Sequence, residues 1–215
     1  DSSNLYFFQI LKYDSSGNYV WNKFIADSAE SRGQILVDEY DNIYYSYRTF
    51  GTTSQDWDVV VSMMDTAGND IWTTAYNNPN NTFDIVTDMK LDHDKNIVLA
   101  CVSRIVDWDL NVVKFDSTGQ FLWSSIFNPV DLTIYLQYRL AIDENNNIYV
   151  SGVEDSTNVI RHGITIKLDP SGTFVWKNKM RANSSHQRNK CSAIAAGQGF
   201  VYVSGTSSNS DYSKY

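Results

Sequence analysis

Short runs that alternate between apolar and polar residues fill the chain, and polar turn-forming residues separate these runs. Residues 7–13, 59–64 and 110–115 are examples, and β-branched and aromatic residues dominate them. This pattern is typical of β-strands. No stretch combines a sustained 3.6-residue period with helix caps. The chain is therefore predicted to be all-β, with almost no helix.

Two motifs recur along the chain with the same period. The first is Asp-x-x-Gly-x-x-x-Trp, in residues 14–21, 65–72, 116–123 and 169–176. The second is an Asp followed four residues later by Asn-Ile, in residues 38–44, 92–98 and 143–149, with a degenerate copy at 196–202. Because two independent motifs keep a spacing of about 51 residues, we interpret the chain as four internal repeats.

Each motif predicts a tight turn between two strands. The Asp carboxylate can accept a backbone N–H two residues further on, and Gly adopts the positive φ that closes the turn. Every repeat then supplies four short strands, which is the content of one β-propeller blade. A lone sheet of this size cannot bury both faces, whereas neighbouring sheets can. We expect the recurring Trp to lie between neighbouring sheets.

Residues 12–21, 114–125 and 141–152 resemble the β-propeller repeat of bacterial and archaeal surface proteins, a family whose name implies seven blades. The likeness covers nearly all of the chain. This chain lacks the Gly-Gly pair that is usual in the family after the strand that contains the Trp. Tyr47 and Cys101 stand where the later repeats have a Gly, and Ala196 stands where the earlier repeats have an Asp. The resemblance implies an extracellular or cell-surface module, and it carries no catalytic residues.

Two other propeller families share parts of the motif. Quinoprotein dehydrogenases differ in the Asp–Gly spacing, and nothing here marks their cofactor residues. A partial likeness to NHL repeats implies a strand order within each blade: the strand that ends near Asp38 innermost, then the strand from Ile43, then the strand before the Asp-x-x-Gly turn, and the Trp strand outermost.

Residues 1–215 are predicted to form a single propeller domain or propeller segment. Two arrangements remain open. Strands 7–13 and 19–25 can join strands 190–195 and 200–205 in a closed four-bladed ring, or the chain is a segment of a larger ring, for example one with seven blades. Residues 211–215 begin like a further third strand, which favours the segment.

Composition restricts the partners. The chain has 17 Lys and Arg and 25 Asp and Glu, which gives a formal charge of −8. Because an acidic surface repels phosphate groups, nucleic acid and anionic lipid are not expected as partners. No apolar run is long enough for a membrane span. Cys101 and Cys191 are read as small buried residues rather than a disulfide, and the acceptor patterns at Asn80 and Asn183 are weak signs of secretion.

The candidate ligand-binding residues are two copies of Asp-Trp-Asp at the same phase of their repeats, expected on the long loops that lead into the third strand: Asp56, Trp57, Asp58, Asp107, Trp108 and Asp109. Trp rings can stack on sugars, and paired carboxylates can bind sugar hydroxyls or Ca²⁺. The alternative is that the aromatic residue packs the edge of a sheet, because Tyr6 has the same phase in the first copy.

Other polar residues are read as structural. His93, His162 and His186 lie at different phases, and no nucleophile accompanies them. Asp38, Asp92 and Asp143 can rim a central channel as a cation site, but side-chain-to-backbone bonding in their turns is the preferred reading. We therefore expect a non-catalytic scaffold or protein-binding module without a resident cofactor or metal, with Ca²⁺ left open. The alternatives are a lectin-like carbohydrate binder and, lowest, a propeller hydrolase or lyase.

Overall fold

The computed structural model describes residues 8–25, 33–50, 57–104, 108–127, 138–155, 161–180 and 188–208. Within these ranges the chain is all-β and contains no helix, as the sequence predicts. No helix long and apolar enough to cross a membrane occurs in this part of the chain. The strands are β1 (Phe8–Tyr13), β2 (Tyr19–Ile25), β3 (Gln34–Val37), β4 (Ile43–Phe50), β5 (Trp57–Met64), β6 (Asp70–Tyr76), β7 (Asp84–Leu91), β8 (Ile97–Arg104), β9 (Trp108–Phe115), β10 (Phe121–Phe127), β11 (Arg139–Ile142), β12 (Ile148–Asp155), β13 (Arg161–Leu168), β14 (Phe174–Lys179), β15 (Arg188–Gly197) and β16 (Phe200–Ser208).

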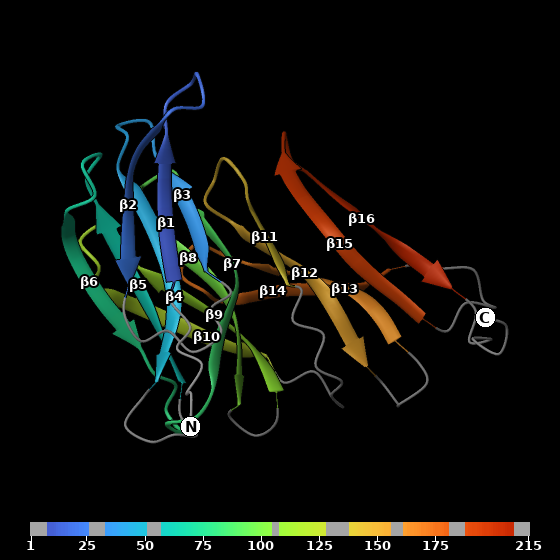
Figure 1. Ribbon diagram of the computed structural model, residues 1–215. Coiled ribbons are helices and arrows are strands. Elements are labelled where there is room, and N and C mark those ends of the chain that lie inside the picture. Colours follow the sequence, from blue (N-terminus) through green and yellow to red (C-terminus); the bar gives the residue numbers. More distant parts are fainter. Residues whose placement is uncertain are drawn as a thin grey trace, which may run out of the picture.

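Three groups of four antiparallel strands follow one another along the chain. We call β3–β6 the first sheet, β7–β10 the second and β11–β14 the third. In each sheet neighbouring strands are consecutive in sequence, which is the strand order that the NHL likeness implies. The sheets lie side by side in chain order (Figure 1), and their first strands β3, β7 and β11 are in contact.

The Asp-x-x-Gly segments form the predicted turns. Asp14 Oδ1 accepts the backbone N–H groups of Ser16 and Asn18 at 2.9 and 2.8 Å, and Gly17 has a φ of 84°. The three later copies repeat this geometry. These hydrogen bonds lower the pKa of Asp14, with the bond from the Asn18 side chain as the largest cause. The carboxylates are therefore parts of the turns.

The turn of the second motif places a non-glycine residue in the left-handed backbone conformation, with a positive φ. Asp38 Oδ1 accepts the N–H groups of Tyr40 and Asn42 at 2.9 Å, and Asp41 has a φ of 63°. Lys95 and Asn146 take the same position in the next two repeats. Side-chain-to-backbone bonding at Asp38, Asp92 and Asp143, the preferred reading of their role, is confirmed.

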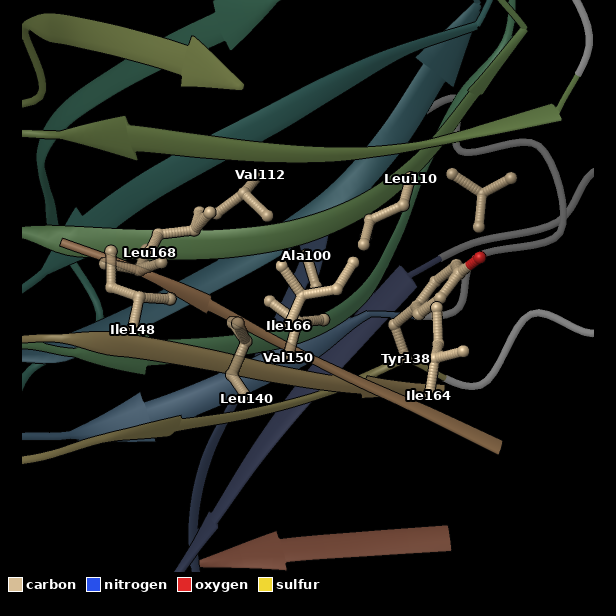
Figure 2. Close-up of a cluster of buried hydrophobic side chains, with 12 residues drawn as sticks. Ala100, Leu110, Val112, Tyr138, Leu140, Ile148, Val150, Ile164, Ile166 and Leu168 are labelled. Atoms are coloured by element: carbon tan, nitrogen blue, oxygen red, sulfur yellow. The ribbon is translucent and has the colours of Figure 1, made fainter. Parts of the chain in front are cut away.

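Buried apolar residues lie between adjacent sheets. Figure 2 shows Ala100, Leu110 and Val112 of the second sheet facing Leu140 and Ile166 of the third sheet. A second cluster joins the first and second sheets, and a third joins the β1–β2 hairpin to the first sheet. Since both faces of the second sheet are covered, its central strand β8 is an almost uninterrupted run of buried residues.

Each of the first three Trp residues packs on the Asp-x-x-Gly turn of the following repeat. The Trp72 ring lies so close to Gly119 that an added Cβ would be 2.6 Å from it, and Trp72 Nε1 donates to the Ser117 carbonyl at 3.2 Å. Trp123 covers Gly172 in the same way, and an added Cβ there would be 2.7 Å from the ring. The expectation that the indoles lie between sheets holds at these positions, with the rings half-buried rather than enclosed.

The two ends of the structure depart from the regular pattern. The β1–β2 hairpin is a separate two-stranded sheet. The β15–β16 hairpin joins the third sheet instead, through one parallel pair between Arg161 of β13 and Arg188 of β15. Figure 1 shows the β15–β16 hairpin apart from the β1–β2 hairpin, on the right of the view. The described strands thus do not close into a four-bladed ring, and the propeller architecture itself stays a prediction.

Both cysteines are free thiols and are buried, with 0% of Cys101 and 2% of Cys191 exposed, which confirms the reading as small core residues. Asn80 lies on an exposed turn, whereas Asn183 falls outside the described ranges.

Replacing Trp123 by Ala should destabilise the protein by about 2–3 kcal/mol, below the 3–5 kcal/mol typical of a fully enclosed Trp because this ring is half-buried. The lost contacts are those with Gly172 and with the core cluster between the second and third sheets. Chemical denaturation monitored by far-UV circular dichroism measures the change. An unaltered midpoint would show that the indole contributes nothing to the contact between these sheets.

Candidate functional site

The structure places the Asp-Trp-Asp segments at the start of the third strand of their sheets. Trp57 and Asp58 begin β5, while Trp108 and Asp109 begin β9. These positions correct the expectation that the segments lie on the preceding loops: Trp57 pairs with Phe50, and Trp108 pairs with Arg104, in the sheets. Asp56 and Asp107 fall outside the described residues. Asp109 is 1% exposed, so its side chain is not on the surface.

The Trp57 ring is held between two side chains of the protein. The Arg48 guanidinium carbon lies 3.5 Å from the ring centroid, and Phe83 meets the ring edge-on with centroids 5.0 Å apart. Arg48 comes from β4 of the same sheet, and Phe83 comes from the segment just before β7. Trp57 therefore bridges the first and second sheets. These contacts fit the packing alternative for the aromatic residue at this phase.

A buried carboxylate lies next to this aromatic contact. Asp84, the first residue of β7, is fully buried, and its Oδ2 accepts the backbone N–H and the side-chain Nδ2 of Asn78 at 2.9 and 3.0 Å. Ser103 Oγ donates to Oδ1. Burial raises the pKa of Asp84 to about 7 despite these hydrogen bonds, and the charge of Asp58 raises it further.

Polar contacts continue from Asp84 across to the first sheet. Asn111 of β9 is fully buried, and its Nδ2 donates to Ser103 Oγ at 3.3 Å and to the Tyr76 hydroxyl at 2.8 Å. Tyr76 ends β6, so this bond connects the outer strand of the first sheet with the third strand of the second. We call Asn78, Asp84, Ser103 and Asn111 the polar cluster.

The polar cluster is not predicted from the repeats, because its residues belong to neither recurring motif. The available signal was local: Ser103 and Asn111 interrupt otherwise apolar strand runs, and Asp84 stands directly before one. Buried polar residues require hydrogen-bond partners, so such interruptions indicate a network. Its members come from different loops and strands, and their pairing follows only from the fold.

The cluster surrounds a carboxylate with donors, and this arrangement does not resemble a cation site. Both Asp84 oxygens accept hydrogen bonds from neutral groups. Within the described ranges, no group of three or more His, Cys, Asp or Glu side chains is positioned to hold a metal ion. The Ca²⁺ reading of the Asp-Trp-Asp segments stays a prediction, since half of its carboxylates lie outside those ranges.

A buried ion pair involves Asp92, the Asp of the second motif in its repeat. Lys114 Nζ lies 2.8 Å from Asp92 Oδ2, with 5% and 0% of the two side chains exposed. Burial alone would raise the pKa of Asp92, but the hydrogen bonds from Lys114 and Asn96 outweigh it and hold this pKa below its usual value. Lys114 Nζ also contacts the Pro170 carbonyl of the next repeat at 3.3 Å. The ion pair therefore helps to join the second and third sheets.

Comparison with protein-family models gives no match for this chain. Comparison with curated proteins likewise gives no significant match. The resemblance to bacterial and archaeal propeller repeats therefore stays a prediction from the residues alone.

Asp84 should make the stability depend on pH in a defined window. Because its pKa is about 7 in the folded protein and 3.8 is the ordinary value, the folded state holds a proton that the unfolded state has lost between these values. This contribution to the unfolding free energy should fall as the pH rises from about 4 to about 7 and then level off. Asp84→Asn should flatten this dependence in melting curves at about pH 5, 6, 7 and 8. An equal slope in both proteins would contradict the assignment.

Lys114→Met should destabilise the protein by about 3 kcal/mol, because it leaves the Asp92 charge buried without its cation. Lys167→Met is the matched control, because Lys167 has the position of Lys114 in the next repeat. There the Tyr149 hydroxyl donates to the motif carboxylate of Asp143 at 2.9 Å, so the loss of the Lys should cost less than about 1 kcal/mol. Urea denaturation of both variants measures the difference. Equal losses would mean that Lys114 acts only through packing.

Proposed function

We propose that this chain is a non-catalytic β-propeller-type module, closed or part of a larger ring, that serves a secreted or cell-surface protein as a scaffold or protein-binding unit. The observation that carries this proposal is that the recurrent Asp and Trp residues contact turns of the protein itself. The motif Asp residues bind their own turns, and three motif Trp residues bind the next turn. The repeated chemistry therefore builds sheets, which leaves interaction to their exposed edges and faces.

Exposed apolar residues support a role in protein contacts. Five aromatic residues of the end hairpins are each more than half exposed: Tyr13, Tyr19 and Phe24 on β1–β2, and Phe200 and Tyr202 on β15–β16. Tyr40, Phe121 and Phe174 of the sheets between them are exposed to a similar degree. Exposed aromatic residues are enriched at protein interaction sites. The charge of −8 favours protein or neutral partners over nucleic acid.

The lectin-like alternative depends on the Asp-Trp-Asp segments. Arg48 and Phe83 already contact the Trp57 ring, and Asp109 is buried. These contacts favour the scaffold over carbohydrate binding through Trp57. The hydrolase or lyase alternative would require a group that attacks or protonates a substrate, and the buried Asp84 is enclosed by donors instead.

The test applies three measurements to the purified chain: cross-linking capture of protein partners from a cell-surface extract, a glycan array, and hydrolysis of generic ester and glycoside substrates. We expect specific protein capture that Trp57→Ala does not alter, with no glycan signal and no turnover. A glycan signal abolished by Trp57→Ala and Trp108→Ala would replace the proposal by the lectin. Turnover by the unaltered chain would replace it by an enzyme.

A further inference from the structure

The second and third sheets fit together differently from the first and second. We call the contact between the first and second sheets the first seam, and the contact between the second and third sheets the second seam. In the first seam Tyr76 stacks on Phe121 with ring centroids 5.9 Å apart, and its hydroxyl accepts a hydrogen bond from Asn111 at 2.8 Å. Phe127 and Ile164 hold the positions of Tyr76 and Asn111 in the second seam. Neither side chain has a polar group, so this hydrogen bond has no counterpart there.

A cavity of about 270 Å³ lies beside these two side chains in the second seam. Leu110, Tyr138 and Ile164 line it, are each at most 6% exposed, and lie together at one end of the core cluster in Figure 2. Ile126 and Phe174 also line it, but they are 43% and 52% exposed. The cavity therefore has a buried apolar interior and a rim that reaches the solvent.

The size and the lining of the cavity favour a small aromatic molecule. An apolar protein cavity of about 150 Å³ can hold one benzene ring. The larger volume here admits a ring that carries a chain of about two or three carbon atoms. A sugar is disfavoured, because its hydroxyl groups would lose their hydrogen bonds with water and gain no partners from apolar walls.

Charged side chains stand at one side of this cavity. Lys177 of β14 lines it, and Lys177 Nζ donates to Glu154 Oε1 at 3.0 Å. Glu154 is only 7% exposed, and Lys179 Nζ lies 3.7 Å from its other carboxylate oxygen. Two ammonium groups thus surround one carboxylate, so positive charge is in excess at this side. Each ammonium has three N–H donors, which leaves Lys177 able to bind an anion as well as Glu154.

Neutral residues hold the two charged positions in the second sheet, on the side of the first seam. Ser103 corresponds there to Glu154, and Ser124 corresponds to Lys177. The cavity and the excess of positive charge therefore occur together, at the place where the second seam departs from the first.

We propose that this cavity binds a small aromatic carboxylate. The ring lies against Leu110 and Ile164, and the carboxylate at the rim accepts a hydrogen bond from Lys177 while Lys179 stays beside Glu154. The two ammonium groups would repel a cationic ligand, and a neutral alcohol would leave the excess charge without a partner. The site goes beyond the proposed function and does not rest on it.

The location is tested by NMR of the methyl-labelled protein with 3-phenylpropionate as the probe. The ring protons should show nuclear Overhauser effects to the methyl groups of Leu110, Ile164 and Ile166. The methyl groups of Ile10 and Val59, which belong to the other two core clusters, should show none. Titration should give a Kd of about 1 mM or below. The site would be overturned by the absence of these effects, or by a free protein in which other side chains of the chain already occupy the cavity.

The charge is tested with matched probes and matched variants. The alcohol 3-phenylpropanol and the amine 3-phenylpropylamine keep the ring and the chain, and each should bind at least about 10-fold more weakly than 3-phenylpropionate. Lys177→Met should raise the Kd of 3-phenylpropionate at least about 10-fold. Lys179→Met is the matched control, because this half-exposed Lys contacts the same carboxylate but does not line the cavity. Its effect should stay below about 3-fold.

Glu154→Gln separates an effect of charge from a loss of structure. This variant removes the carboxylate that competes for Lys177, so the Kd of 3-phenylpropionate should fall by about 3-fold, whereas damage to the cavity would raise it. Weaker binding by this variant, equal binding of the alcohol and the carboxylate, or equal effects of the two Lys variants would overturn the inference. None of these outcomes bears on the capture of protein partners, so the site and the scaffold are tested separately.

Discussion

The contact of an indole with a glycine turn in the next repeat is the constraint on which this structure depends. At Gly119 and Gly172 one residue meets two demands: a φ of 84° closes the turn, and the missing Cβ leaves room for the ring. The local shape of the turn and the distance between sheets are thereby set together. This coupling explains why Asp, Gly and Trp recur as one unit, whereas the strand residues around them vary.

Variation elsewhere is compensated inside each repeat. The position that holds Tyr44, Val98 and Tyr149 pairs across strands with Met63, Lys114 and Lys167. Where a Tyr is present, its hydroxyl reaches the motif carboxylate, and where Val98 replaces it, Lys114 takes over as an ion pair. Asp38, Asp92 and Asp143 therefore each keep a partner beyond their own turns, which Asp92 and Asp143 require because they are buried.

Much of the fold could be predicted from the sequence. Turn chemistry and strand composition are local, so the four strands per repeat and the roles of Asp14 and Asp38 followed from their spacing alone. The polar cluster could not be predicted, because Asn78, Asp84 and Asn111 meet only when two sheets pack. The positions of Trp57 and Asp58 show a second limit: the strand begins earlier than its apolar run, since cross-strand pairing with β4 extends it.

The fourth repeat shows how the loss of one motif residue changes more than a turn. In the earlier repeats an Asp directly follows the first strand, and in the first sheet five residues connect Val37 to Ile43. With Ala196 in place of that Asp, Gln198 and Gly199 make a two-residue turn with φ values of 52° and 78°, and pairing continues to Gly197 and Phe200. The hairpin is longer than its counterparts, and β15 makes a parallel contact with β13. The repeat with the degenerate second motif is therefore the one whose hairpin differs in turn and length from its counterparts, which ties the five-residue connection to the motif Asp.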